Sequence, residues 1–334
     1  MLNKPLGRFL TGVAVLLIIV IGWFILQVDP IFSSQGKKVI VTVQPGDSMS
    51  AIASELHTQG VIASPFAFRL DTLLFGSIQV QAGSYEIRQH SSFSKVRAII
   101  GSTPNVQVVN VTPGLTLHEV AVDVANAMGD SYANQFSKDA TQAVTLSTFS
   151  SAGSLEGLIG TGTYIIKPGE TPLHLVKRMV DAFTKESASV GLTPSTTVNG
   201  LNAYQLIIAA SIVEKEGYYP INMPQVARVI FNRLHRGGPL QMDATVLYYL
   251  GQDGGTVTPA MLQNQEPYNT YLNNGLTPTP ICAVSTIALR ATLHAPPGPW
   301  LYFTLVNKDG REAFAATFAK QLANERLAQS RGVG

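Results

Sequence analysis

Two carboxylates and a lysine close an apolar run of the sequence, Leu206 to Glu216. When this run is placed on a helix, its apolar side chains fall on every side, which is the pattern of a helix buried on all faces. A carboxyl group on a wall of Ile and Ala side chains loses hydration, which disfavours the anion and suits the group to act as a general acid near neutral pH. Glu214 and Glu216 are therefore candidate catalytic groups, and the alternative is that these charges merely cap a helix end.

The helical wheel separates the two carboxylates. Glu214 falls beside Ile207 and Ala210, whereas Glu216 lies roughly 200° away. We therefore expect that the two groups do not flank one bond, and that one of them acts alone.

Further motifs follow this run in a fixed order. They are Ser211-Ile-Val-Glu-Lys-Glu216, Val229-Ile-Phe-Asn-Arg-Leu234, Pro239-Leu-Gln-Met-Asp-Ala-Thr-Val246 and Tyr268-Asn-Thr-Tyr271. Together they resemble the endolytic murein transglycosylase (YceG-like) family. The resemblance is strong from Leu206 to Leu276 and weaker over the rest of the chain. It implies an enzyme that cleaves the bond from N-acetylmuramic acid to N-acetylglucosamine in peptidoglycan glycan strands.

The resemblance also implies roles for individual residues. Lytic transglycosylases let the C6 hydroxyl of the muramic sugar attack C1, which gives a 1,6-anhydro end, so one glutamate serves as acid and then as base. Glu214 is assigned to that role, with Glu216 as the weaker alternative. The groups expected to contact substrate are Ser211, Glu216, Arg233, Gln241, Asp243, Tyr268, Asn269 and Tyr271.

These assignments leave alternatives open. Each of these residues could be scaffolding, and Arg233 could be structural or could pair with Glu216 or with a peptide carboxylate. Asp243 could act as a second carboxylate with water as the nucleophile, which would make the protein a muramidase. The groove could also hold glycan without cleaving it, which would make the protein a wall-binding scaffold.

Two segments depart from the family pattern. The chain has Thr161-Gly162 where the family has Pro-Asp, so the role of that acid is in doubt. It also lacks the Pro-Gly pair that the family places after Pro-Ile, because Ala283 to Ser285 follow here. This second departure puts the rim of the groove in doubt, but not the central motifs.

The surrounding elements must position the carboxylates. Asn202 is a plausible N-cap and Pro220 bars continuation, so the central helix should run from Ala203 to about Glu216. Other helices are expected at 48–56, 65–75, 93–100, 117–128, 173–184, 223–235, 244–250 and 283–294. Strands are expected at 38–43, 83–87, 106–111 and 300–305, with a return strand at 313–315.

Phe9 to Val28 is an uncharged apolar run. It is long enough to span a bilayer and lacks a small-residue cleavage pattern, which favours a transmembrane anchor over a signal peptide. Lys4 and Arg8 precede the run, which places the N-terminus in the cytoplasm and the rest of the chain outside. We expect a single-pass protein of the bacterial cytoplasmic (inner) membrane.

The fold class expected is α+β. The parts are a cytoplasmic tail (1–8), a transmembrane helix (9–28), a LysM-like α+β module (38–102), a connecting segment (105–200) and a mixed α+β catalytic domain (201–330). Val43-Gln-Pro-Gly-Asp-Ser48 and Ile52-Ala-Ser-Glu-Leu56 carry the resemblance to LysM. That module binds peptidoglycan or serves only as a spacer.

Composition narrows the function further. The 334 residues are 46% hydrophobic and 13% charged, so the chain can bury sizeable cores. A net charge of +2 gives no reason to expect a nucleic-acid partner. One cysteine and six scattered histidines predict no disulfide, metal or cofactor. The expected partners are glycan strands, the membrane and a peptidoglycan synthase.

Overall fold

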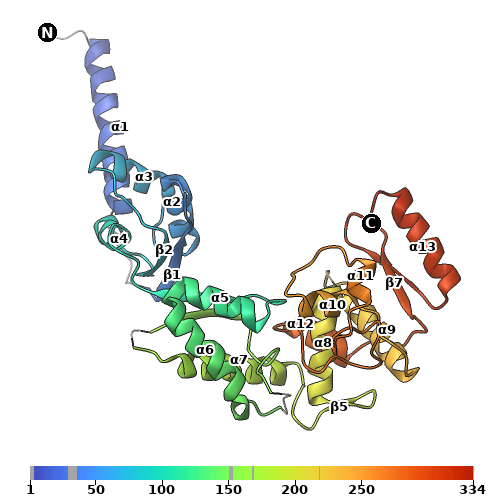
Figure 1. Ribbon diagram of the computed structural model, residues 1–334. Coiled ribbons are helices and arrows are strands. Elements are labelled where there is room, and N and C mark those ends of the chain that lie inside the picture. Colours follow the sequence, from blue (N-terminus) through green and yellow to red (C-terminus); the bar gives the residue numbers. More distant parts are fainter. Residues whose placement is uncertain (1–3, 29–35, 150–152, 168, 218, 334) are drawn as a thin grey trace. The chain divides into compact units, whose positions relative to one another are not determined.

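The computed structural model describes residues 4–28, 36–149, 153–167, 169–217 and 219–333, and for residues 4–10 it describes the backbone alone. Part of the expected cytoplasmic tail and most of the residues joining the first helix to the first strand therefore lie outside the described residues. The chain divides into two compact units (Figure 1). The first comprises residues up to Val108 with Ile165–Lys167, and the second comprises Val109–Tyr164 and everything from Pro168 onward.

The first unit begins with the apolar helix and continues as a small α+β module. Its elements are α1 (Lys4–Val28), β1 (Lys38–Val43), α2 (Met49–Thr58), α3 (Pro65–Leu74), β2 (Gly83–Arg88) and α4 (Phe93–Ile100). Each lies within a few residues of its predicted range. The strands β1 and β2 pair antiparallel, with Val41 opposite Tyr85.

The helices and strands of this module pack around one hydrophobic core. The helix α2 contributes Ile52, Ala53 and Leu56 to this core, all of them buried. Phe68 of α3 meets Phe93 of α4 edge to face, with ring centroids 5.1 Å apart. Aromatic pairs in this geometry stabilise a core beyond the area that they bury.

The second unit is mostly helical. Its helices are α5 (Leu117–Met128), α6 (Asp130–Gln142), the 3-10 turn η1 (Val144–Leu146), α7 (Pro172–Ser189), α8 (Ala203–Glu216), α9 (Met223–His235), α10 (Asp243–Tyr249), α11 (Pro259–Leu262), α12 (Thr286–Leu293) and α13 (Phe318–Ser330). Short strand pairs accompany them: β5 (Thr197–Val198) with β6 (Leu201–Asn202), and β7 (Tyr302–Leu305) with β8 (Glu312–Ala315). The strands β3 (Gln107–Val111) and β4 (Gly162–Ile166) form one further pair.

Several elements of this unit were not predicted. The helix α6 is polar, and of its residues Ala133, Phe136 and Ala140 are buried, which leaves a weak pattern in the sequence. The helix α13 buries Gln321 and Asn324, polar residues that hide its packed face from a hydrophobicity reading. The helix α12 begins at Thr286 rather than at Ala283, because the residues just before it bond to α8, as described below.

The central helix α8 has the predicted bounds, Ala203–Glu216. Asn202 and Gln205 form a reciprocal capping box, in which each side chain accepts a hydrogen bond from the backbone N–H of the other. Leu206 through Val213 are all buried, which confirms the prediction of a helix covered on every face. The helix packs against α9, α10 and α12 (Figure 1).

Candidate active site

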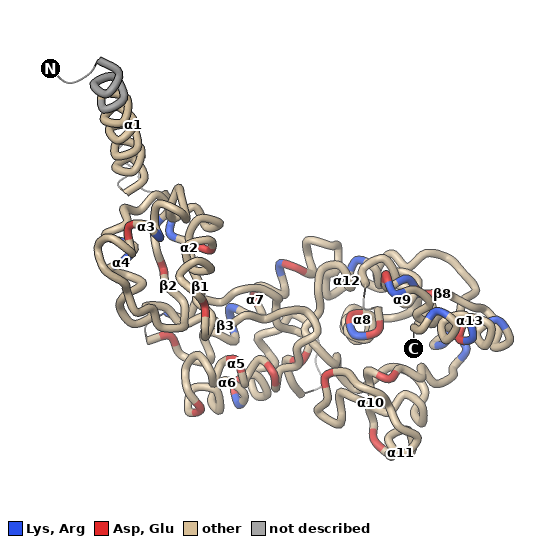
Figure 2. Tube along the Cα trace, turned by 90° about the horizontal axis from the view of Figure 1, so that it is seen from above, with Lys and Arg blue, Asp and Glu red and all other residues tan. Residues whose placement is uncertain are grey.

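The C-terminal end of α8 gathers the charged residues of the site. Figure 2 views α8 almost along its axis, with acidic and basic positions on the same ring. Glu214, Lys215 and Glu216 are half-buried there, directly after the fully covered part of the helix. Each of the three side chains has a different partner, and these partners fix the geometry of the site.

Glu214 is tied to the segment that leads into α12. Its Oε2 accepts a hydrogen bond of 2.8 Å from the backbone N–H of Ser285, the N-cap residue of α12. One turn earlier, the Ser211 hydroxyl donates to the Ile208 carbonyl oxygen and accepts from the Ile281 backbone N–H at 3.0 Å. The segment that departs from the family pattern, Ala283 to Ser285, is therefore the one that holds Glu214.

Glu216 is held at the start of α10. Its Oε1 accepts a hydrogen bond of 3.0 Å from the Ala244 backbone N–H. Burial raises the pKa of Glu216 to about 7; the Asp243 carboxylate also raises it, while the Ala244 N–H and Arg233 lower it. Glu312 lies nearby in this electrostatic network, on β8. Its pKa is raised to about 8, chiefly by burial and also by the charge of Glu216.

Both carboxylates open into one cavity. Glu214, Glu216 and Asp243 line a hollow of about 490 Å³, closed on another side by the segment from Thr112 to Leu115. Their backbone partners, on α12 and on α10, lie in different directions, in agreement with the helical wheel. The expectation that the two carboxylates do not flank one bond stays a prediction, because lining the same hollow does not fix the distance between their carboxyl groups.

Lys215 lies between the two glutamates in the sequence. Its ammonium group donates to the Gly114 carbonyl oxygen at 3.2 Å and pairs with Asp253. Lys215 and Asp253 line the 490 Å³ hollow and also a second cavity of about 320 Å³. This ion pair is thus shared between two neighbouring hollows.

A buried glutamate that the sequence analysis gave no role, Glu156, lines the second cavity. Its side chain accepts hydrogen bonds from the Leu117 backbone N–H at 3.1 and 3.2 Å and from the Tyr248 hydroxyl at 3.1 Å. Burial raises the pKa of Glu156 to about 7, against the lowering effect of these donors. The clue in the sequence was Leu155-Glu-Gly157, which belongs to a segment that resembles the family.

The expected substrate-contacting residues separate into exposed and structural groups. Asp243 is exposed in the first cavity and accepts a hydrogen bond from the Tyr271 hydroxyl. Tyr268 lies in the second cavity, with its ring centroid 5.0 Å from that of Tyr248. Gln241 is exposed, but it lines a smaller hollow with Arg233 and Tyr302.

The other expected contact residues hold the scaffold. Arg233 donates to the carbonyl oxygens of Leu301 and Leu240, which favours its structural alternative. Asn269 is 2% exposed. Its side-chain amide donates hydrogen bonds to the carbonyl oxygens of Leu262 and Asn264 and accepts one from the Tyr271 backbone N–H. Ser211 is fully buried. Asn269 and Ser211 therefore shape the groove from behind and do not line it.

Among the residues that the structure describes, no three His, Cys, Asp or Glu side chains converge as metal ligands would.

Comparison with known proteins places this site in a family. The YceG-like family model matches residues 41–327. An endolytic murein transglycosylase of Bacillus subtilis is 29% identical over 86% of this chain and 84% of its own length. A protein of the same name from Streptococcus pneumoniae is 25% identical over 86% of this chain, which spans 57% of that protein's length.

The fold agrees with that placement. A crystal structure of a putative YceG-like protein from Listeria monocytogenes matches with a TM-score of 0.59 and 24% identity, covering 86% of this chain and 99% of that one. Since the family model extends over most of the sequence, including α8 and both cavities, this chain belongs to the YceG-like family.

Proposed function

We propose that this protein is an endolytic lytic transglycosylase of peptidoglycan, which cleaves the bond from N-acetylmuramic acid to N-acetylglucosamine. The observation that carries the proposal is the pair of glutamates at the end of α8, which open into one 490 Å³ cavity in a chain of the YceG-like family. The relatives named endolytic murein transglycosylase support the substrate class.

The reaction requires one proton and one internal nucleophile. The glutamic acid gives its proton to the glycosidic oxygen, and the bond from that oxygen to C1 of the muramic sugar breaks as positive charge develops on C1. The resulting carboxylate then takes the proton of the muramic C6 hydroxyl, whose oxygen bonds to C1. The products are a 1,6-anhydro end and a free hydroxyl on N-acetylglucosamine, and no water is consumed.

We assign this acid and base role to Glu214 on the family resemblance. Glu216 is a stronger alternative than its sequence position suggested, because it lines the same cavity and its pKa, raised to about 7, suits proton donation near neutral pH. Asp243 and Tyr271 form one hydrogen-bonded rim for the sugar hydroxyl or N-acetyl groups. Tyr268 and Tyr248 offer ring faces for sugar stacking in the second cavity.

A muramidase reaction is the second candidate, and a specific observation favours it. With Glu214, Glu216 and Asp243 in one cavity, a second carboxylate is available to activate water. The two reactions differ in product mass, because an anhydro end is lighter than a reducing end by one water. Sacculus binding without release of fragments would instead indicate a wall-binding scaffold.

The cellular setting belongs to the same proposal. The apolar helix α1, with Thr11–Val28 long and apolar enough to cross a membrane, supports a single-pass anchor that holds the enzyme on the outer side of the cytoplasmic membrane. At that place the enzyme would end the elongation of nascent strands beside a peptidoglycan synthase. The module at 38–102 is proposed to add affinity for glycan, as its LysM-like motifs suggest.

The test compares two conservative variants of the full-length protein on purified sacculi. Glu214→Gln keeps the size and the acceptor for Ser285 but removes the transferable proton. General acid–base catalysis contributes about 10²–10⁴-fold, so release of anhydro-ended fragments, counted by mass spectrometry, should fall by at least about 100-fold. Glu216→Gln should lower it much less. If the losses are reversed, Glu216 is the acid; if both variants stay active, the catalytic acid lies elsewhere.

A further inference from the structure

The helix α3 of the first unit carries a group of exposed apolar side chains. Phe66, Leu73, Leu74 and the following Phe75 are 66%, 79%, 63% and 67% exposed. Phe66 and Leu73 also line a hollow of about 460 Å³, together with Met49, Leu70 and Ile78. A cluster of large exposed apolar groups marks a contact surface in a soluble or membrane-bound protein. We call these four residues the α3 patch.

The same helix lies beside α1 (Figure 1). Phe24 and Val28, one turn apart near the end of α1, are half-buried and pack against the core of the module. Ile18 and Ile25 of α1, by contrast, are 69% and 52% exposed. The module therefore covers one side of the last turn of α1 and leaves the rest of the apolar surface of that helix open.

This packing sets the depth of the module. The segment of α1 that is apolar enough to span a membrane ends at Val28, and Phe24 lies about one turn, roughly 5.4 Å, inside that end. Where the module touches Phe24, it must lie at the level of the outermost hydrocarbon and the lipid headgroups. Aromatic and leucine side chains are favourable at that level.

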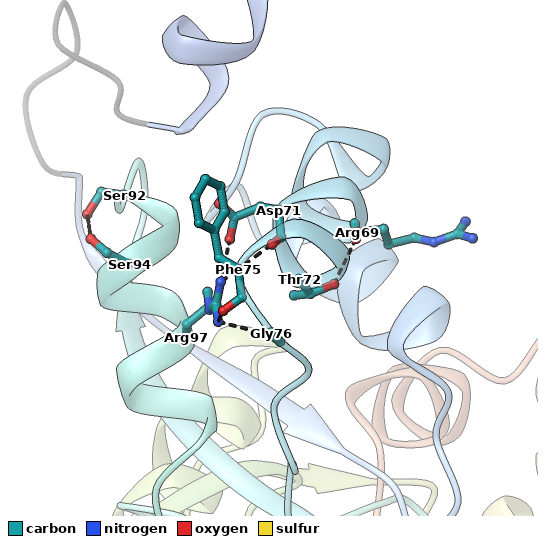
Figure 3. A network of polar contacts seen from close by, with 8 residues as sticks. All are labelled: Arg69, Asp71, Thr72, Phe75, Gly76, Ser92, Ser94 and Arg97. Carbon is teal, nitrogen blue, oxygen red and sulfur yellow. Dashed lines mark hydrogen bonds and ion pairs between the residues drawn. The ribbon is translucent and has the colours of Figure 1, made fainter.

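The end of α3 is built to present the patch. Arg97 of α4 bonds the Asp71 carboxylate at 3.2 Å, and its other nitrogen donates to the carbonyl oxygens of Phe75 and Gly76 at 2.8 and 2.9 Å. Figure 3 shows this network, with the Phe75 ring extending away from the Arg97 guanidinium. These bonds satisfy carbonyl groups at the end of α3 and hold Phe75 outward.

We propose that the α3 patch inserts into the interface of the phospholipid bilayer beside α1, so that the module has a second membrane contact. The inference rests on the anchor in the proposed function. The bilayer is the occupant because α3 packs beside α1, the helix that is proposed to span the membrane. Arg69 is exposed on the same helix, where a cation can meet lipid phosphate groups. Elements of this kind reach about 5–10 Å into the headgroup and acyl boundary.

Site-directed spin labelling of the full-length protein tests the depth. Leu73→Cys would carry a nitroxide in vesicles of phosphatidylethanolamine and phosphatidylglycerol. The matched control is Lys38→Cys on β1, which lies farther than α3 from the N-terminal end of α1 in both views (Figures 1 and 2). Lys38 has a 55% exposed side chain, and Cys282 is fully buried, so the unsubstituted chain serves as the blank.

The expected result is that oxygen, which concentrates in lipid, relaxes the Leu73 label more than a water-soluble nickel chelate does, with the reverse at Lys38. In one contrary outcome, the protein floats with the vesicles while its Leu73 label is as accessible to the nickel chelate as the Lys38 label. That result would contradict insertion of the α3 patch but would leave the membrane anchor supported. A Leu73 label shielded from both reagents overturns it as well, because a second copy or another protein then covers the patch. Failure to float overturns anchor and patch together. Release of anhydro-ended fragments is measured in parallel and tests the catalytic proposal separately.

Discussion

At the scale of single residues, the second unit contains three carboxyl groups with a raised pKa. Glu156, Glu216 and Glu312 each have a pKa raised chiefly by burial, to about 7, 7 and 8. Glu156 and Glu216 each accept backbone N–H groups at the start of a helix, α5 and α10, which partly offsets the cost of their charge. Groups poised in this way near neutral pH are candidates for proton transfer.

Glu156 makes the stability of the protein depend on pH. Its pKa rises from 4.5 to about 7 on folding, so between these values the folded state holds a proton that the unfolded state releases. The stabilisation is present below pH 4.5 and is lost as pH rises through about 7, by roughly 3 kcal/mol in all. Glu156→Gln removes this titration, so the variant should not lose that stability as pH rises. The difference in the free energy of unfolding, variant minus wild type, should therefore increase between pH 5 and about pH 8.

Denaturant unfolding of the detergent-solubilised protein at several pH values measures this difference. Asp181→Asn is the control, because that side chain is 52% exposed. It should give a difference that changes little with pH. A constant difference for Glu156→Gln as well would mean that burial does not govern the protonation of Glu156.

At the scale of elements, α8 is the part that positions the proposed catalytic groups, Glu214 and Glu216. It is buried from Leu206 to Val213, capped at Asn202, and joined near its end to the segment before α12 through Ser211 and Glu214. Its last turn lies close to the start of α9, where Gly217 approaches Met223. A glycine at this point permits a contact that a side chain would prevent.

Gly217→Ala should destabilise the protein through that contact. An added Cβ would lie 2.8 Å from Met223 Cγ and 2.9 Å from the Val213 carbonyl oxygen. Overpacking of this kind costs about 1–3 kcal/mol. The backbone φ of Gly217 is −83°, so conformational strain adds nothing. Thermal unfolding measures the effect, and Gly238→Ala, with no atom within 4 Å of the added Cβ, is the matched control. Equal melting temperatures for the two variants would contradict the tight approach.

How far the sequence predicted these elements depended on the kind of pattern. Strong periodicity and caps located α2, α8 and α9 closely, because apolar side chains and N-cap residues act locally. The polar helices α6 and α13 were missed, because few apolar residues mark the packed face of α6 and because α13 buries the polar residues Gln321 and Asn324. The candidate site followed the same division. Glu214 and Glu216 were found on one helix, whereas Glu156 and Asp253 reach the neighbouring cavity through tertiary folding.

At the scale of the whole molecule, the chain combines an apolar helix and a small module with a second unit that carries the proposed catalytic groups. Residues 11–28 of α1 carry no charge (Figure 2). That composition fits a single-pass membrane anchor. The arrangement suits an enzyme whose substrate is a polymer made at the membrane surface.

The anchor is tested by placing a charge in the middle of α1. Ile18 is 69% exposed, so Ile18→Arg disturbs no packing within the protein. In a bilayer, an arginine at the centre of a helix costs about 2.5–3.5 kcal/mol on insertion scales. We therefore expect less of the variant in the membrane fraction after an alkaline carbonate wash, while the control Ile18→Leu stays there. A C-terminal alkaline phosphatase fusion, active only outside the cytoplasm, should be active on the wild type and weakened by Ile18→Arg. Recovery of a soluble wild-type form beginning near residue 29 would show that α1 is a cleaved signal sequence, and equal membrane retention of both variants would show that α1 does not cross the bilayer.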